Sequence, residues 1–119
     1  MQTAGRNALD AHLFTDIDAL RSMRASAGQR YFEFLRVPNL SAGLYHLDAG
    51  AEDPQSVHEQ DEVYIVASGR GRFRMGSDDR EIGPGSVLFV AALLPHRFHD
   101  LVEPLDVLVV FGPAEGLAR

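Results

Sequence analysis

Two histidines and one glutamate, His58, Glu62 and His96, have the side chains of a metal site. His58 and Glu62 lie in the segment V-H-E-Q-D-E-V-Y-I-V, and His96 lies in L-P-H-R-F. Neutral imidazole nitrogens and one carboxylate bind divalent cations, and three protein ligands leave further coordination positions open. Because water, dioxygen or a substrate can occupy an open position, we expect the function of the chain to reside at these residues.

The composition excludes several other kinds of chemistry. The chain of 119 residues contains no cysteine, which rules out disulfides, thiolate metal ligands and cysteine nucleophiles. All 11 basic residues are arginine, so there is no lysine to form a Schiff base. The net charge of −6 argues against a nucleic-acid-binding surface, which needs a basic patch.

The sequence also argues against a membrane protein. Its longest apolar runs are far too short to cross a bilayer. The segment from Met1 to Asp10 lacks the apolar core of a signal peptide, so we expect a cytoplasmic protein.

The elements that must position the candidate ligands are mostly short strands. From Tyr31 onward, short runs rich in β-branched and aromatic side chains alternate with Gly, Pro and Asp turns, which predicts an all-β sandwich or barrel. Before them, an acidic first turn and the run Ala19 to Ala27 predict a short helix that ends at Gly28, with an irregular lead-in as the alternative. The whole chain is expected to be one domain (1–119) with an amino-terminal arm or short helix (1–28), a β-barrel (29–112) and a carboxyl-terminal tail (113–119).

Strand alternation places the candidate ligands on the inner face of this barrel. Side chains two positions apart on a strand point to the same face, so Glu62 and Tyr64 lie together, and His58 joins them if the strand begins early. His96 and Phe98 also share a face, and the arginine between them is expected outside. Buried ionisable groups are costly unless they are paired or coordinated, and one metal ion would satisfy all three candidate ligands.

Two segments resemble the motifs of the cupin superfamily. The segment from Gly50 to Gly69 is similar to the first motif, which is G, five residues, H-x-H, three residues, E, six residues, G. The segment from Gly85 to Asp100 is similar to the second motif. The resemblance implies a double-stranded β-helix, the jelly-roll barrel of cupins. It also implies a divalent metal ion (Fe, Mn, Ni or Zn) held by His58, Glu62 and His96.

One position departs from the first motif. Ser56 stands where the family has its first histidine, and a hydroxyl is a weaker metal ligand than an imidazole. Gln55 or Gln60 could supply an additional oxygen to the metal. Around the metal, the residues expected to line a ligand-binding pocket are Ser56, Gln60, Tyr64 and Phe98.

Two functions are consistent with such a site. The first is a metal-binding cupin that acts on a small organic molecule by a dioxygenase-, isomerase- or hydrolase-type reaction. The second is a non-catalytic cupin that binds or senses a small ligand at a degenerate metal site, which Ser56 favours. The alternative to metal binding is a metal-free cluster in which the three polar residues hydrogen-bond to one another.

The remaining histidines and an arginine stripe have simpler interpretations. His46 could face the cavity, but a single strand histidine is more often structural. His99 is expected on the solvated face of its strand. Three alternating arginines predict a solvent-facing stripe over an apolar inner face, with anion recognition as the alternative; they are Arg70, Arg72 and Arg74.

Aromatic residues near the first strand bear on oligomeric state. Tyr31, Phe32 and Phe34 look exposed in the sequence pattern, and together with the family resemblance they predict a homodimer formed by sheet packing. The alternative is that these side chains complete the core of the barrel.

Overall fold

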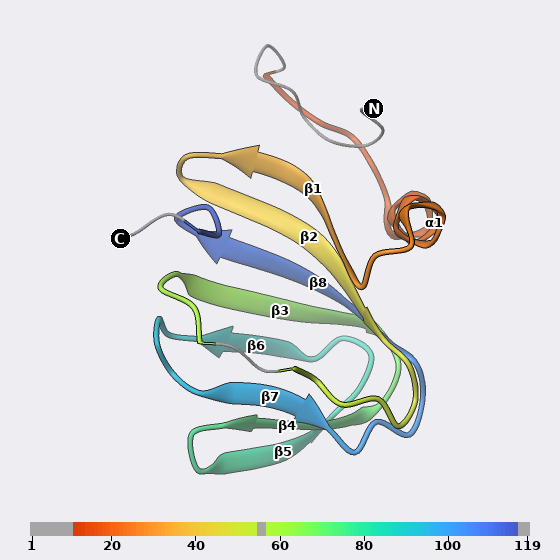
Figure 1. Ribbon diagram of the computed structural model, residues 1–119, viewed down its shortest axis with the longest axis vertical. Helices are drawn as coiled ribbons and strands as arrows, with labels where there is room; N and C mark the ends of the chain where they lie inside the picture. Colours follow the sequence, from red (N-terminus) through yellow and green to blue (C-terminus); the bar gives the residue numbers. More distant parts are fainter. Residues whose placement is uncertain (1–10, 55–56, 117–119) are drawn as a thin grey trace.

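The computed structural model describes residues 11–54 and 57–116, and this part of the chain forms one helix followed by strands (Figure 1). The elements are α1 (Ile17–Ala27), β1 (Tyr31–Val37), β2 (Leu40–Leu47), β3 (Asp61–Ser68), β4 (Gly71–Met75), β5 (Asp78–Ile82), β6 (Val87–Val90), β7 (His96–His99) and β8 (Leu105–Gly112). The predicted all-β class with one short amino-terminal helix is therefore confirmed. No helix in the described ranges is long and apolar enough to span a membrane.

The strands form two antiparallel sheets. The larger sheet has the order β1-β2-β8-β3-β6, and the smaller has the order β5-β4-β7. Strand β8 pairs with β2 on one side and with β3 on the other, so the last strand of the chain lies in the middle of the larger sheet (Figure 1). The two sheets pack face to face as the jelly-roll barrel predicted from the sequence.

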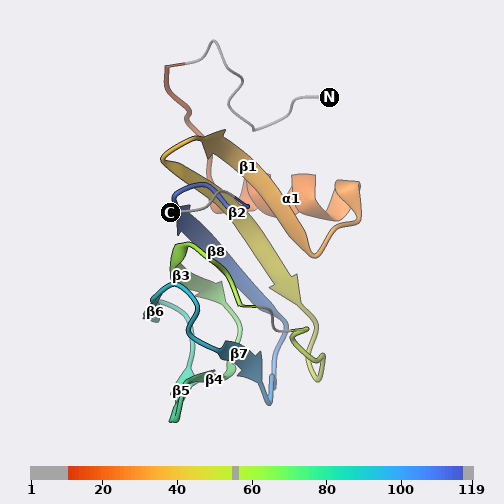
Figure 2. The ribbon, with the colours of Figure 1, turned by 60° about the vertical axis from the view of Figure 1, so that its left-hand side comes forward.

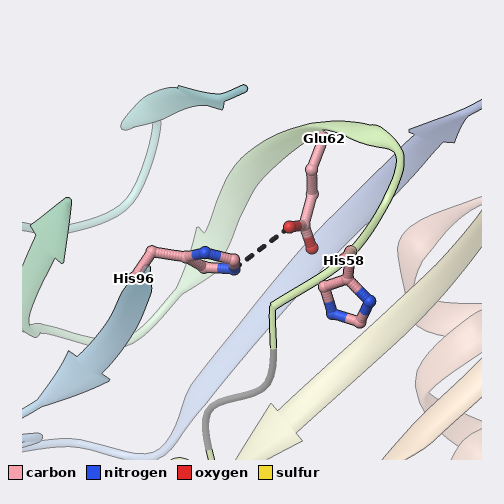
Figure 3. A group of neighbouring side chains, drawn as sticks. All are labelled: His58, Glu62 and His96. Atoms are coloured by element: carbon pink, nitrogen blue, oxygen red, sulfur yellow. Dashed lines mark ion pairs between the residues drawn. The ribbon is translucent and has the colours of Figure 1, made fainter. Parts of the chain in front are cut away.

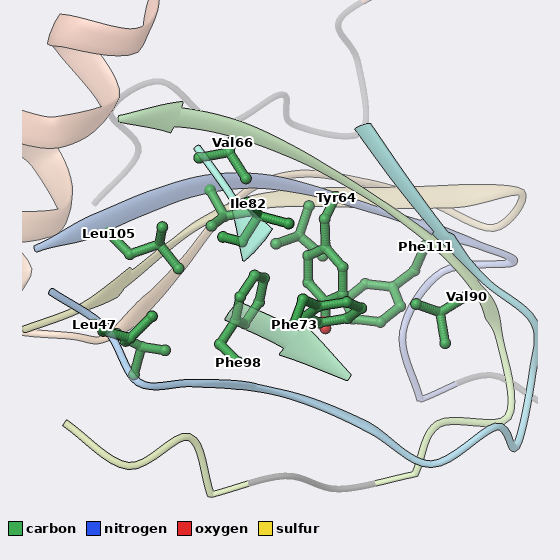
Figure 4. Packing of buried hydrophobic residues seen from close by; sticks show 12 residues of the cluster. Leu47, Tyr64, Val66, Phe73, Ile82, Val90, Phe98, Leu105 and Phe111 are labelled. Carbon is green, nitrogen blue, oxygen red and sulfur yellow. The ribbon is translucent and has the colours of Figure 1, made fainter. Parts of the chain in front are cut away.

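The main hydrophobic core lies between the inner faces of the two sheets (Figure 4). Tyr64 and Phe111 come from the larger sheet, while Phe73 and Phe98 come from the smaller one. The rings of Phe73 and Phe98 lie 4.5 Å apart between centroids, and Tyr64 contacts both edge-on. Tyr64 and Phe73 also lie 5.9 and 6.0 Å from the ring of His96 between centroids, so the aromatic cluster borders the polar side chains of the barrel interior.

Helix α1 covers part of the outer face of the larger sheet. Its amino terminus is capped by the side chain of Asp16, which accepts the N–H of Ala19 at 2.8 Å, and it ends at Gly28 with a left-handed φ of 67°. Leu20 of the helix packs against Phe32, Phe34 and other buried residues of β1 and β2. Figure 2 shows the helix beside these two strands, away from β3 and β6.

The same outer face carries two apolar rows that cross four strands. One row runs through the paired residues Ala42, Val110, Val63 and Phe89, and the other through Leu44, Leu108, Ile65 and Val87. The rows are buried at the β2 end, where α1 lies, and exposed at the β6 end, where Phe89 is 59% and Val87 is 68% exposed. Part of a continuous apolar face is therefore uncovered.

One expectation from the sequence needs correction, and one strand was not recognised in it. Phe32 and Phe34 are not exposed but buried beneath α1, while half-buried Tyr31 turns to the opposite face of the sheet and packs against the main core. Strand β5 has no counterpart among the apolar runs of the sequence, because its residues, D-D-R-E-I, are polar. It forms because it is the edge strand of the smaller sheet, where its charged side chains remain in water.

Candidate metal centre

Three segments bring the candidate ligands together inside the barrel (Figure 3). His58 lies in the loop before β3, Glu62 is the second residue of β3, and His96 is the first residue of β7. One ligand atom from each side chain lies within 4.8 Å of the others. Ligands of one metal ion are separated by roughly 3 to 3.5 Å at usual metal–ligand distances, so a shift of about 1 Å would bring these atoms into a coordination sphere.

His96 is oriented by a backbone carbonyl. Its Nδ1–H donates to the carbonyl oxygen of Leu94 at 2.7 Å, which directs Nε2 toward Glu62 Oε1 at 3.1 Å. Burial lowers the pKa of His96, but the contacts with Glu62 and Leu94 more than offset burial and raise the pKa above its usual value. A backbone acceptor on the second nitrogen is the usual arrangement for a metal-binding histidine.

Glu62 supplies the observation that tests whether a metal fits. Its side chain is 2% exposed, and Oε1 lies 3.1 Å from His96 Nε2 as an ion pair but has no hydrogen-bond partner among the described residues. A buried carboxylate oxygen without a hydrogen bond costs free energy that a cation would recover. The donor set of two imidazoles and one carboxylate is suited to zinc, iron, manganese or nickel, so the three residues fit a divalent metal.

Tyr64 places a neutral hydroxyl beside these groups. Its Oη lies 3.2 Å from His96 Nε2, and the whole residue is 5% exposed. Burial raises the pKa of Tyr64 far above its usual value, and the negative charge of Glu62 adds to this effect. The phenol therefore remains protonated and can donate a hydrogen bond.

A pocket of about 180 Å³ opens beside the three candidate ligands. This volume corresponds to roughly six water molecules, so any ligand must be small. Asp53 forms part of its wall, since its carboxylate accepts hydrogen bonds from Tyr45 Oη at 2.7 Å and from the N–H of Phe98 at 2.9 Å. The lining residues are Tyr31, Tyr45, Asp53, Pro54, His58, Glu62, Tyr64, His96, Val109, Phe111 and Glu115.

The segment after β8 carries Glu115 to the mouth of this pocket. The N–H of Glu115 donates to the Oγ of buried Ser41 at 2.8 Å, and its carbonyl oxygen accepts from Arg36 at 2.6 Å. These bonds fix the backbone while the side-chain Oε2 lies 3.7 Å from His58 Nδ1. Burial raises the pKa of Glu115, and the nearby His58 opposes that shift in part.

The structure places most of the residues selected from the sequence near one another. Tyr64 lines the pocket, Gln60 is buried just before β3, and Phe98 lies deeper in the core without lining the pocket itself. Ser56 and Gln55 fall outside the described residues.

Sequence reasoning missed Tyr31, Tyr45, Asp53 and Glu115, which also line the pocket. Strand parity could have placed Tyr31 and Tyr45 on one face, because they are paired across β1 and β2. No local pattern marks Asp53 or Glu115, because both lie in irregular segments outside the strands.

The other histidines lie outside the pocket. His46 sits on the outer side of the larger sheet between Asp106 and Asp48, at 2.8 and 3.0 Å, so its structural interpretation is favoured. His99 was expected to be solvated, but its side chain is only 17% exposed because it lies between Asp79 and Asp100. The arginine stripe is solvent-facing as expected, and Asp79 pairs with two of its members.

Comparison with known proteins agrees with the fold described above. Residues 43–111 match the family described as Cupin domain. The uncharacterised protein SCO3923 of Streptomyces coelicolor is 48% identical over 99 residues, which cover 83% of this chain and 94% of that protein.

Two solved structures show the same fold. TT1209 from Thermus thermophilus is 28% identical, with a TM-score of 0.64, and the match covers 71% of this chain and 82% of that one. The DMSP lyase DddQ from Ruegeria pomeroyi is 22% identical, with a TM-score of 0.67, and the match covers 87% of this chain and 68% of that one.

Proposed function

Since this chain belongs to the cupin domain family, we propose that it holds one divalent metal ion through His58, Glu62 and His96 and binds a small organic molecule beside it. The observation that carries this proposal is the buried Oε1 of Glu62, which lacks a hydrogen bond among the described residues and lies beside two imidazoles. A bound ion would supply Lewis-acid chemistry or, with iron, oxygen activation. The fold itself does not select a reaction, because cupin-like barrels serve many functions.

The residues around the ligands support binding of a small molecule. Tyr64 offers a hydroxyl that stays protonated next to His96, so it can donate to an oxygen or nitrogen of the bound molecule. Val109 and Phe111 provide the apolar part of the wall, which excludes water from that side. We therefore propose a dioxygenase-, isomerase- or hydrolase-type enzyme, and the identity of the metal determines which reaction should be assayed. The similarity to the DMSP lyase, at 22% identity, supports the fold and no particular reaction.

A non-catalytic ligand-binding or sensing protein is the second candidate. It is favoured by Ser56, which replaces a histidine of the first cupin motif and leaves the site with one imidazole fewer. Restoring that histidine with Ser56→His separates the two candidates. A large gain in metal affinity would show that the native site is weak and would favour sensing. An unchanged affinity would show that three ligands suffice and would favour catalysis.

The primary test is the metal content of the protein purified without chelators. We expect near-stoichiometric metal in the native protein and loss of that metal in His58→Ala, because removing one of three ligands leaves too few donors. His99→Ala is the matched control, since His99 lies outside the pocket and should not affect metal content. Absence of metal in the native protein, together with no uptake on reconstitution, would contradict the proposal.

We also propose that two copies pair through the uncovered part of the outer sheet face on β3 and β6. The apolar rows continue without interruption from beneath α1 to Ile65, Val87 and Phe89 at this edge. A second copy presents the same rows and would cover them symmetrically. A stable dimer buries about 800 Å² per partner, so the polar residues around these side chains must also take part. The cytoplasmic location and the single-domain organisation stay predictions.

A further inference from the structure

We propose that the pocket selects a small organic cation and that the carboxylate of Glu115 binds its positive group. This inference rests on the proposed function, because it concerns the molecule that binds beside the metal. Three observations support it: the carboxylates that line the pocket, the aromatic rings in its wall, and the hydrogen bond that fixes the backbone of Glu115 after β8.

The charge of the pocket is the first observation. Three carboxylates line it, those of Asp53, Glu62 and Glu115, and no arginine lines it among the described residues. With neutral histidines, these carboxylates outweigh a divalent ion by one negative charge. Among the described residues no cationic side chain lines the pocket for an anionic ligand, and Arg36 reaches only the backbone carbonyl of Glu115, whereas a monovalent cation would balance the site.

The position of Glu115 is the second observation. A hydrogen bond from its N–H to Ser41 and one from Arg36 to its carbonyl hold its backbone, so the carboxylate is held at the pocket mouth rather than moving freely in solvent. Its side chain is 34% exposed, and its distance of 3.7 Å from His58 Nδ1 is too long for a hydrogen bond. The carboxylate is therefore still available to accept hydrogen bonds from a ligand.

The aromatic wall is the third observation. The ring of Tyr31 lies edge-to-face with Tyr45, at 6.5 Å between centroids, and with Phe111, at 6.4 Å, and all three residues line the pocket. Tyr31 can lie there because its ring passes over Gly43, where a Cβ atom would collide with it. Aromatic faces next to carboxylates favour organic cations, since the ring quadrupole attracts positive charge.

The hydroxyl of Tyr31 adds a polar group to this wall. Its Oη is buried and has no hydrogen-bond partner among the described residues. Because a buried hydroxyl without a partner costs free energy, a ligand that carries a hydrogen-bonding group would recover that cost. The pocket thus fits a small ammonium compound with a polar substituent.

The test uses three probes that share a tert-butyl body and differ in charge: tert-butylammonium, tert-butanol and pivalate. Each is titrated into the full-length protein, loaded with Zn²⁺, and its dissociation constant is measured from NMR shifts. We expect tert-butylammonium to bind about tenfold more tightly than tert-butanol. Pivalate can coordinate an open position of Zn²⁺ directly, so its affinity is compared in the metal-free protein, where it should bind no more tightly than tert-butanol. Equal affinity for tert-butylammonium and tert-butanol, or tightest binding of pivalate to the metal-free protein, would overturn the proposal.

Variants assign the selectivity to Glu115. Glu115→Gln should bring the affinity for tert-butylammonium down to that for tert-butanol and leave the dissociation constant for Zn²⁺ unchanged within about twofold. The matched control is Glu103→Gln, which removes an equal charge from an exposed position outside the pocket and should preserve selectivity. A loss of Zn²⁺ affinity with selectivity retained would show that Glu115 serves His58 instead and would overturn the proposal.

Failure of the proposed metal site can be distinguished from failure of the proposed cation selectivity. Uptake of Zn²⁺ is measured before the probes are added, and absence of uptake contradicts the metal site alone. Asp53 and Glu115 remain in the metal-free protein, so the same three probes are then compared there. A preference for the cation would still support the charge selectivity, and no preference would overturn it.

Discussion

His96 uses its two ring nitrogens for different purposes. Nδ1–H donates to the carbonyl of Leu94, and Nε2 faces the carboxylate of Glu62. A proton on Nε2 is favoured by that carboxylate, which together with Leu94 raises the pKa of His96 despite burial. A metal ion at this site must displace that proton, so protons and metal compete for one atom.

This competition predicts opposite pH dependences for metal binding and for the stability of the metal-free protein. Zn²⁺ affinity should fall as the pH is lowered through the raised pKa of His96, by about tenfold per pH unit below it. In the metal-free protein, the raised pKa contributes stability that is fully present below the unfolded value of about 6.5 and is lost as the pH rises through the folded value.

Two measurements check this prediction: Zn²⁺ competition with a chromophoric chelator, and urea unfolding in the presence of EDTA, each over a pH series. His96→Gln should abolish the pH dependence of stability that arises at this residue. If both quantities changed in the same direction with pH, His96 would not be the group that protons and metal share.

At the scale of elements, α1 is attached to the sheet by an ion pair as well as by apolar contacts. Arg21 Nε lies 3.0 Å from Asp106 Oδ2, and Asp106 Oδ1 contacts His46 at 2.8 Å. Burial raises the pKa of Asp106, but the hydrogen bonds from His46 and Arg21 more than offset burial and lower it overall. The carboxylate of β8 therefore holds the helix against the strands in its ionised form.

Asp106→Asn should destabilise the protein by about 1 kcal/mol at neutral pH, a modest value because Arg21 is partly exposed. A lowered pKa gives stability that is present above the unfolded value of about 3.9 and is lost as the pH falls through the folded value. The difference between mutant and native protein should therefore disappear in acid. Urea unfolding over a pH series measures this difference in the free energy of unfolding.

Asp18→Asn is the matched control for this prediction. Asp18 also contacts Arg21 at 2.9 Å, but its side chain is 90% exposed. Its replacement should therefore change the free energy of unfolding much less. An equal effect of the two replacements would show that burial of Asp106 does not strengthen the contact.

The elements themselves were largely predictable, and the contacts between them were not. Alternating apolar residues marked most strands, and the acidic first turn with Gly28 marked the helix. The polar strand β5 could not be recognised, because an edge strand exposed to water lacks the apolar pattern that identifies buried strands.

Part of the candidate site could likewise be predicted from the sequence, and part could not. His58, Glu62 and His96 could be found because imidazole and carboxylate side chains are rare on an inner face and follow known spacings. The contribution of Glu115 depends on Ser41 and Arg36, which come from a distant hairpin. Such long-range hydrogen bonds leave no local signal in the sequence.

For the whole molecule, the outer face of the larger sheet is covered unevenly. Helix α1 buries the outer face at β1 and β2, and Phe89 and Val87 remain exposed at β6. Contiguous exposed apolar side chains usually mark an interaction surface. The proposed dimer interface and the proposed metal and ligand site thus lie on opposite faces of one sheet.

Phe89→Glu should convert a dimer into a monomer at micromolar concentration, because it places a charge in the centre of the proposed interface. Light scattering coupled to size-exclusion chromatography measures the mass. Val102→Glu, at a residue 73% exposed and outside these rows, should leave the mass unchanged. A native protein that is already monomeric would disprove pairing through this face and leave the metal site unaffected.

The central place of β8 has a consequence for synthesis of the protein. Ribosomes make the chain from its amino terminus, so β2 and β3 emerge before the strand that must lie between them. During that interval, two apolar strands have unpaired edges and cannot complete the larger sheet. The nascent chain should therefore depend on chaperones or on rapid translation until Leu105–Gly112 is released, and the larger sheet should be completed only after this strand has emerged.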